Sequence, residues 1–309
     1  MKTIFLIFSL ALAGIGVEAQ GDTTALFGRW DITVHAPGRD FASWLEVNRS
    51  GSRYMVGRFV GEGGSSRPIS RVNLENGKMY FSIPPQWESE DRNLDVEGSM
   101  QGDSLVGTMV TPRGETLHWV GYRAPALTRQ GEPVWGQSIP LFNGKDLSGW
   151  HVTGKPNQWM VEDGILRSPR PGSNIVTDQK FTDFKLHIEF RYPKRGNSGV
   201  YLRGRYEVQI EDEEGGVTAP NEVIGSVYGF LPPVERASKG PGVWQTYDIT
   251  LVGRLVTVVF NGKTVICRSE IPGTTGGALD SQEGEPGPIF LQGDHRAIEY
   301  RNIILTPAK

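Results

Sequence analysis

The chain has 309 residues, a formal net charge of −3, 38% hydrophobic and 22% charged residues. This length exceeds one average domain, so we expect two folded units. No long basic block is present, which argues against a nucleic-acid partner because phosphates require a concentrated Lys/Arg surface. With 40 Gly and 20 Pro, the composition indicates short strands joined by many turns.

The N-terminus has the pattern of a secretory signal peptide over residues 1–19. A lysine precedes the apolar run from Ile4 to Ala13, and small residues close the segment. The run is short for a membrane span, which needs about 20 apolar residues. We therefore expect an exported protein, periplasmic or extracellular, with no membrane association after signal removal. The single cysteine, Cys267, excludes an intramolecular disulfide.

Residues 20–124 form the first predicted unit. Segments such as FGRWDITV, RYMVGRFV and TLHWVGYR alternate apolar and polar residues and are separated by Gly-containing turns. The pattern predicts a small antiparallel barrel, similar in strand rhythm to the calycin-type barrels. Residues 125–138 carry Pro and Gly without periodicity and are expected to be a linker.

Residues 139–307 form the second predicted unit, again rich in short alternating strands. The FNGK sequence at 260–263 predicts an Asn-Gly hairpin. A length of about 170 residues with this rhythm favours a two-sheet jelly roll. The expected fold class is therefore all-β throughout.

Two stretches of the second unit carry an unusual polar face. In FKLHIEFRY, Phe184 and its alternate neighbours make an apolar face, and Lys, His, Glu and Arg lie opposite. In YLRGRYEVQIED the same mixture returns, with Glu207 and Gln209 on one face of a strand. A solvated surface would explain either stretch alone. Their recurrence predicts one concave, sugar-binding groove formed by neighbouring strands.

Several motifs in fixed order give this unit a family resemblance. They are LFNGKDLSGW, VEDGILRS, FTDFKLHIEFRYPKRGNSGVYLRGRYEVQIED, GSVYGF, VWQTYDITLVGRLVTVVFNGKTV and GPIFLQGDHRAIEYRNIIL. Residues 139–306 together resemble the 3-keto-disaccharide hydrolase family. The resemblance implies a concanavalin-like β-sandwich and activity on glycosides whose C3 hydroxyl has been oxidised to a ketone. Where the family usually has Leu-Gln-x-His-Gly, this chain has LQGDHRA, with Arg after His295.

A 3-keto sugar has an acidified proton at C2, and the glycosidic oxygen at C1 is then a β-leaving group. Elimination followed by hydration needs a base, a proton donor and a stabiliser for the enolate oxygen. Glu207 and His295 are the catalytic candidates, because both side chains suit proton transfer. Arg191 and Arg203 are candidates for enolate stabilisation. The remaining predicted substrate-binding residues are Glu189, Asn197, Tyr201, Gln209, Tyr228, Trp244 and Gln292.

Alternatives remain open at this point. Glu207 would also fit a structural partner of an arginine, His295 a turn residue and Trp244 a core residue. A carbohydrate-binding protein without catalysis would use the same groove but need no acid–base pair. A conventional glycosidase would place Glu189 and Glu207 on either side of the scissile bond.

The acidic run 211–214 offers oxygen ligands, with Asp212 as a possible Ca²⁺ ligand. Its consecutive charges lack metal-ligand spacing and equally fit a solvated loop. No cofactor is otherwise expected, and the expected partner is a carbohydrate.

Overall fold

The computed structural model describes residues 23–154, 156–213 and 218–309. Apart from one 3-10 turn at Thr23–Leu26, every regular element in these ranges is a strand, so the all-β prediction is confirmed. None of the helical segments described there is long and apolar enough to cross a membrane. The expected signal peptide lies outside the described residues.

The first eight strands close into a barrel in chain order, each pairing with the next and β8 returning to β1. Inward-facing aromatic and aliphatic side chains fill it, including the fully buried Trp30 and the nearly buried Trp119. Closure leaves no unpaired strand edge. The strands are β1 Gly28–Ala36, β2 Arg39–Ser50, β3 Tyr54–Val60, β4 Arg67–Glu75, β5 Lys78–Ile83, β6 Leu94–Gln101, β7 Ser104–Val110 and β8 Thr116–Arg123.

The second half is a sandwich of two sheets around one hydrophobic core. The five-stranded sheet has the order β10 Trp150–Val152, β13 Ile175–Thr177, β20 Phe290–Leu291, β15 Asn197–Leu202 and β16 Tyr206–Glu211. The larger sheet has the order β11 Met160–Glu162, β12 Ile165–Ser168, β21 Ile298–Pro307, β14 Phe184–Arg191, β17 Gln245–Val252, β18 Leu255–Phe260 and β19 Lys263–Glu270, with β9 Ile139–Pro140 paired to β21.

Local turn chemistry follows the sequence closely. Asn261 and Gly262 both have positive φ between β18 and β19, which confirms the Asn-Gly hairpin. The chain crosses from the larger sheet to the smaller one at residues 192–196, between β14 and β15. Because both sheets direct apolar residues into the shared core, their polar residues point away from each other, on opposite outer faces.

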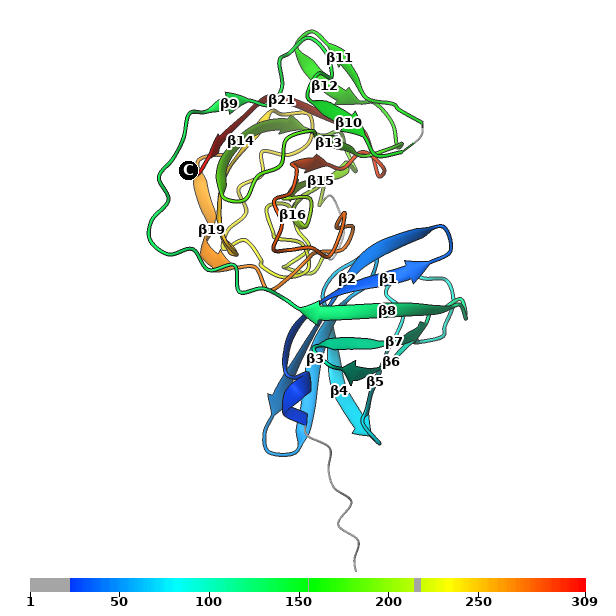
Figure 1. The fold of residues 1–309 in the computed structure, drawn as a ribbon. Helices are drawn as coiled ribbons and strands as arrows, with labels where there is room; N and C mark the ends of the chain where they lie inside the picture. The colour runs from blue at the N-terminus through cyan, green and yellow to red at the C-terminus, as the bar shows by residue number, and fades with distance from the viewer. Residues whose placement is uncertain (1–22, 155, 214–217) are drawn as a thin grey trace, which may run out of the picture.

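The barrel is docked onto the sandwich (Figure 1). Trp44 of β2 packs edge-to-face on Phe230, with ring centroids 5.3 Å apart. The backbone N–H of Gly277 donates to the carbonyl of Glu62 at 2.8 Å, which ties a sandwich loop to the β3–β4 loop. The segment after β8 runs around the outside of the sandwich to β9 in Figure 1. Arg254 donates to the carbonyl of Pro125 in that segment at 2.9 Å.

Candidate active site

A cavity of about 790 Å³ lies between one end of the barrel and the outer face of the five-stranded sheet. This volume is within the range of small-molecule sites. The sandwich contributes a wall that is mostly polar, and the barrel contributes its hairpin loops. The sandwich residues lining the cavity are Asn174, Asn197, Tyr201, Glu207, Gln209, Tyr228, Gly276, Gly277, Phe290, Gln292, Asp294 and His295.

Glu207 lies in the floor of the cavity on β16, only 4% exposed. Strand alternation sends its neighbours Tyr206 and Val208 into the core and its own side chain outward, beneath the barrel. Burial raises the pKa of Glu207 to about 8, although a hydrogen bond from Tyr201 partly opposes the rise. At neutral pH this carboxyl therefore mostly carries a proton.

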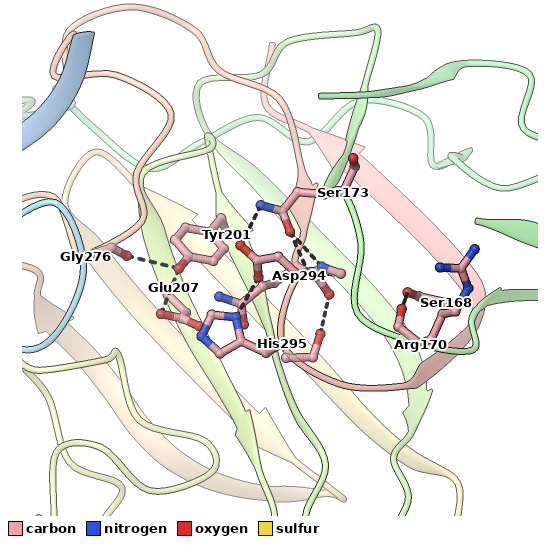
Figure 2. A network of polar contacts seen from close by, with 12 residues as sticks. Ser168, Arg170, Ser173, Tyr201, Glu207, Gly276, Asp294 and His295 are labelled. Atoms are coloured by element: carbon pink, nitrogen blue, oxygen red, sulfur yellow. Dashed lines mark hydrogen bonds and ion pairs between the residues drawn. The ribbon is translucent and has the colours of Figure 1, made fainter. Parts of the chain in front are cut away.

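The Glu207 carboxyl occupies space that is free only because residue 199 is a glycine. A Cβ on Gly199, in the neighbouring strand β15, would lie 2.2 Å from Oε1 of Glu207. The pairing of β15 with β16 holds Gly199 and Glu207 in contact. In its register Tyr201 is directly opposite Glu207. Figure 2 shows Tyr201 between Glu207 and the carbonyl of Gly276.

Asp294 and His295 form a second titratable group on the same cavity wall. Nδ1–H of His295 donates to Oδ1 of Asp294 at 2.6 Å (Figure 2). This hydrogen bond raises the pKa of His295 against the opposing effect of burial. Burial by itself would raise the pKa of Asp294, but the His295 and Asn174 hydrogen bonds outweigh it and hold the pKa below its usual range. Asp294 thus fixes the imidazole and leaves Nε2 available, as a base-orienting carboxylate does.

Neutral hydrogen-bonding groups surround these acids and bases. Oε1 of Gln292 is buried without a hydrogen-bond partner, although the side chain lines the cavity. A buried polar atom of this kind is costly unless a ligand satisfies it. Burial, with Glu222 and Glu207 nearby, raises the pKa of Tyr228, so its hydroxyl remains a donor. Asn197 and Gln209 complete the polar wall.

The structure brings both predicted catalytic residues, Glu207 and His295, into this one cavity. Five of the predicted substrate-binding residues join them there. These are Asn197, Tyr201, Gln209, Tyr228 and Gln292.

Three predicted groove residues, Glu189, Arg191 and Trp244, lie elsewhere. Glu189 accepts hydrogen bonds from Arg301 and Asn302, and Arg191 stacks over Trp244 at 4.8 Å. Glu189 and Arg191 are on β14 of the larger sheet, so their polar face is opposite to that of β16. The prediction of one groove across both stretches was wrong. Glu189 and Glu207 are on opposite outer faces and cannot flank one glycosidic bond.

Arg203 also differs from its predicted role. It has a positive φ of 52° in the β15–β16 turn, where strand alternation ends. Its guanidinium is buried and donates to the carbonyl of Gly253 at 2.8 Å and to the hydroxyl of Tyr206 at 3.1 Å. Arg203 therefore stabilises the core beneath the site and does not line the cavity. The predicted enolate-stabilising role of both arginines was wrong.

Within the acidic run, Asp212 and Glu213 are engaged in local contacts. Asp212 accepts a hydrogen bond from the backbone N–H of Arg195 at 2.6 Å, and Glu213 forms an ion pair with Arg236. Across residues 23–154, 156–213 and 218–309, no group of three His, Cys, Asp or Glu side chains is arranged to hold a metal ion. Glu214 lies outside the described residues.

Sequence reasoning missed Asp294, Asn174 and the whole barrel side of the cavity. Oδ1 of Asn174 accepts from the backbone N–H of Gly293 at 2.7 Å, which shapes the loop that carries His295. Asp294 had a local signal, since an Asp directly before a His supplies a carboxylate to its imidazole. Asn174 and the barrel had none, because only long-range packing brings them to the site.

A buried carboxyl and an Asp-supported histidine over the polar face of a β-sandwich form a site suited to proton transfer. The family described as the 3-keto-alpha-glucoside-1,2-lyase-like domain matches residues 137–306, more than half of the chain. The chain belongs to this family, which confirms the resemblance drawn from the motifs.

Individual relatives also match part of the chain. A 3-keto-disaccharide hydrolase of Bacteroides thetaiotaomicron is 25% identical over 41% of this chain. That match spans 57% of the relative, so the chain covers little more than half of its length. Two crystal structures of candidate glycosyl hydrolases from Parabacteroides distasonis are also similar. They show 32% and 29% identity, cover 59% and 55% of this chain and 96% and 98% of theirs, and have TM-scores of 0.48 and 0.45.

Proposed function

We propose that this protein cleaves 3-keto-glycosides by elimination and hydration. The observation that carries the proposal is the presence of two distinct proton-transfer groups in one cavity: the buried carboxyl of Glu207 and the Asp294–His295 pair. Family membership supplies the substrate class. A binding module would need the amides and aromatic rings but not these groups. Export, expected from residues 1–19, is part of the same proposal.

The geometry supports a division of roles. Nε2 of His295, with Nδ1–H held by Asp294, removes the C2 proton next to the ketone. The C1–O bond breaks, and Glu207 gives its proton to the leaving oxygen, since its raised pKa keeps it protonated at neutral pH. The products of this step are the departing alcohol and an unsaturated 3-keto sugar.

Hydration completes the reaction with the same two groups in reversed roles. The Glu207 carboxylate accepts a proton from water as the oxygen adds to C1, and the His295 imidazolium returns a proton to C2. The hydroxyl of Tyr228 and the amide of Gln292 are available to hydrogen-bond the enolate oxygen at C3. No predicted arginine is needed for that charge.

Proton exchange at C2 tests the assignment directly. A methyl 3-keto-glucoside is incubated in D₂O with wild type, Glu207→Gln and His295→Ala, and both C2 deuteration and methanol release are followed. We expect Glu207→Gln to lose cleavage by about 10²–10⁴-fold while C2 exchange continues, and His295→Ala to lose both. Loss of exchange in Glu207→Gln alone would reverse the roles. Absence of cleavage and exchange in wild type would reject the function.

The unoxidised parent glycoside serves as the matched control. Its cleavage by wild type would indicate a conventional glycosidase. If wild type binds both sugars in calorimetry without cleaving either, the protein is a carbohydrate-binding module.

A further inference from the structure

The barrel half of the cavity differs in chemistry from the sandwich half. Its lining comes from one end of the barrel, where the β1–β2, β3–β4, β5–β6 and β7–β8 loops meet. Between the loops, apolar side chains of the barrel core face the cavity, and Trp87 stands at the rim with 59% of its surface exposed. The apolar lining residues of this end are Phe41, Phe59, Leu94, Met109 and Leu117.

Three arginines at this end have carboxylate partners, and Glu115 adds a further carboxylate. Arg39 forms an ion pair with Glu62. Arg113 lies 3.9 Å from Glu90. The half-buried Arg67 interacts electrostatically with Glu88. Each arginine is thus offset by a carboxylate, so the barrel end has no unbalanced cation to select an anionic ligand.

The barrel is fixed in place over the site. A Cβ on Gly276 would lie 2.4 Å from the carbonyl oxygen of Gly64, and one on Gly229 would lie 2.6 Å from the backbone of Ser66. Such close backbone approach, with the Trp44–Phe230 contact, holds the β3–β4 loop against the sandwich. The barrel end is therefore one wall of the cavity, continuous with the polar wall that carries Glu207 and His295.

We propose that the open end of the barrel is the aglycone subsite of this enzyme and that it takes a neutral, apolar leaving group. The inference rests on the proposed function. That function places the 3-keto sugar ring against the polar sandwich wall, which leaves the barrel side of the cavity for the leaving group. Hydroxyls of a second sugar that lie against Phe41, Leu94 and Met109 would lose hydrogen bonds to water without replacement. Polar side chains of the same end are engaged with one another, as Gln86 is with Ser65 at 2.9 Å. An aromatic or alkyl aglycone instead buries apolar surface there.

The test compares 3-keto-glucosides of one anomer that carry a methyl group, a benzyl group or a second glucose. Methanol and benzyl alcohol are leaving groups of similar basicity, so their ratio reports binding rather than intrinsic reactivity. We expect wild type to prefer the benzyl over the methyl compound by tenfold or more in kcat/KM, and to prefer it over the disaccharide.

Variants assign the preference to the barrel. Leu94→Asn and Trp87→Ala should each lower the benzyl-to-methyl ratio at least fivefold. Leu74→Asn changes a half-buried leucine of the same barrel core away from the cavity, and Tyr122→Ala removes an exposed aromatic ring elsewhere. Both controls should keep the wild-type ratio. A wild-type ratio near one, a preference for the disaccharide, or an unchanged ratio in both cavity variants would overturn the subsite.

Failure of the two proposals is distinguishable. If no keto glycoside is cleaved, the proposed function fails, and the subsite is then tested by calorimetric binding of the methyl and benzyl compounds. Tighter binding of the benzyl compound, weakened by Leu94→Asn but not by Leu74→Asn, would support the apolar subsite. Equal binding of both compounds would reject it.

Discussion

The hydroxyl of Tyr201 lies 3.0 Å from Oε2 of Glu207 and 3.0 Å from the carbonyl oxygen of Gly276. One hydroxyl has one proton, so it donates fully to only one of these acceptors. The two acceptors therefore share the Tyr201 proton, and the bond to Glu207 lowers the pKa of that carboxyl against the effect of burial. Burial outweighs this hydrogen bond, so the pKa of Glu207 is still raised, to about 8, at the floor of the site.

The raised pKa of Glu207 predicts a pH-dependent stability difference. A folded-state pKa of about 8, against 4.5 for the free group, means that the folded chain holds the proton more tightly. The contribution of this proton to the free energy of unfolding is complete below pH 4.5 and is lost as the pH rises to about 8. Between pH 4.5 and pH 9, the free energy of unfolding of Glu207→Gln should therefore increase relative to that of wild type by on the order of a few kcal/mol. Calorimetric melting at both pH values checks this. A constant difference between the two proteins would contradict it.

Gly199→Ala should displace the Glu207 carboxyl without affecting the backbone. Gly199 is not among the residues with positive φ, so alanine is conformationally allowed. Its Cβ would overlap Oε1 of Glu207 at 2.2 Å, and we expect a loss of about 10²-fold in kcat with a cost of about 1–3 kcal/mol in stability. Gly284→Ala, where the nearest atom would be 3.7 Å away, is the control. Full activity of Gly199→Ala would show that the carboxyl position is not critical.

Glu189→Gln should leave kcat/KM for a 3-keto-glucoside within about twofold of wild type. Glu189 pairs with Arg301 and Asn302 on the outer face of the larger sheet, away from the cavity. The half-exposed ion pair contributes about 1 kcal/mol or less to stability. Steady-state kinetics and thermal melting measure both effects. A loss of activity comparable to that of Glu207→Gln would restore a two-carboxylate mechanism.

Asp31→Asn should make the junction between barrel and sandwich less sensitive to alkali. Asp31 of β1 is 6% exposed beside Glu283, to which Arg254 donates at 2.6 Å. Burial and the adjacent Glu283 raise the pKa of Asp31 to about 10 from 3.8. Wild type therefore loses stability as the pH rises from 3.8 to about 10, and the variant lacks this loss. Melting temperatures at pH 6 and 9.5 provide the measurement. The exposed Asp95→Asn should follow wild type, and an Asp31→Asn profile identical to wild type would be evidence against a buried neutral carboxyl.

The sequence determined the local features of this protein. Period-two alternation predicted that Glu207 and Gln209 face away from the core. Successive side chains of a strand point to opposite faces of the sheet, so a strand with one face in the core directs every second residue outward. Asn261-Gly262 predicted its turn, because those residues tolerate positive φ. Ordered motifs identified the family without any knowledge of the contacts.

The tertiary structure decided which strands share a sheet and what covers the site. β14 and β15 are consecutive in sequence, yet they join different sheets. β15 pairs instead with β20, where Val200 is opposite Leu291. Such pairings, and the docking of the barrel over Glu207, depend on contacts between residues far apart in the chain. A local pattern carries no information about the partner of a strand, so the sequence could place a polar face on β14 and on β16 but not tell that the two faces point in opposite directions.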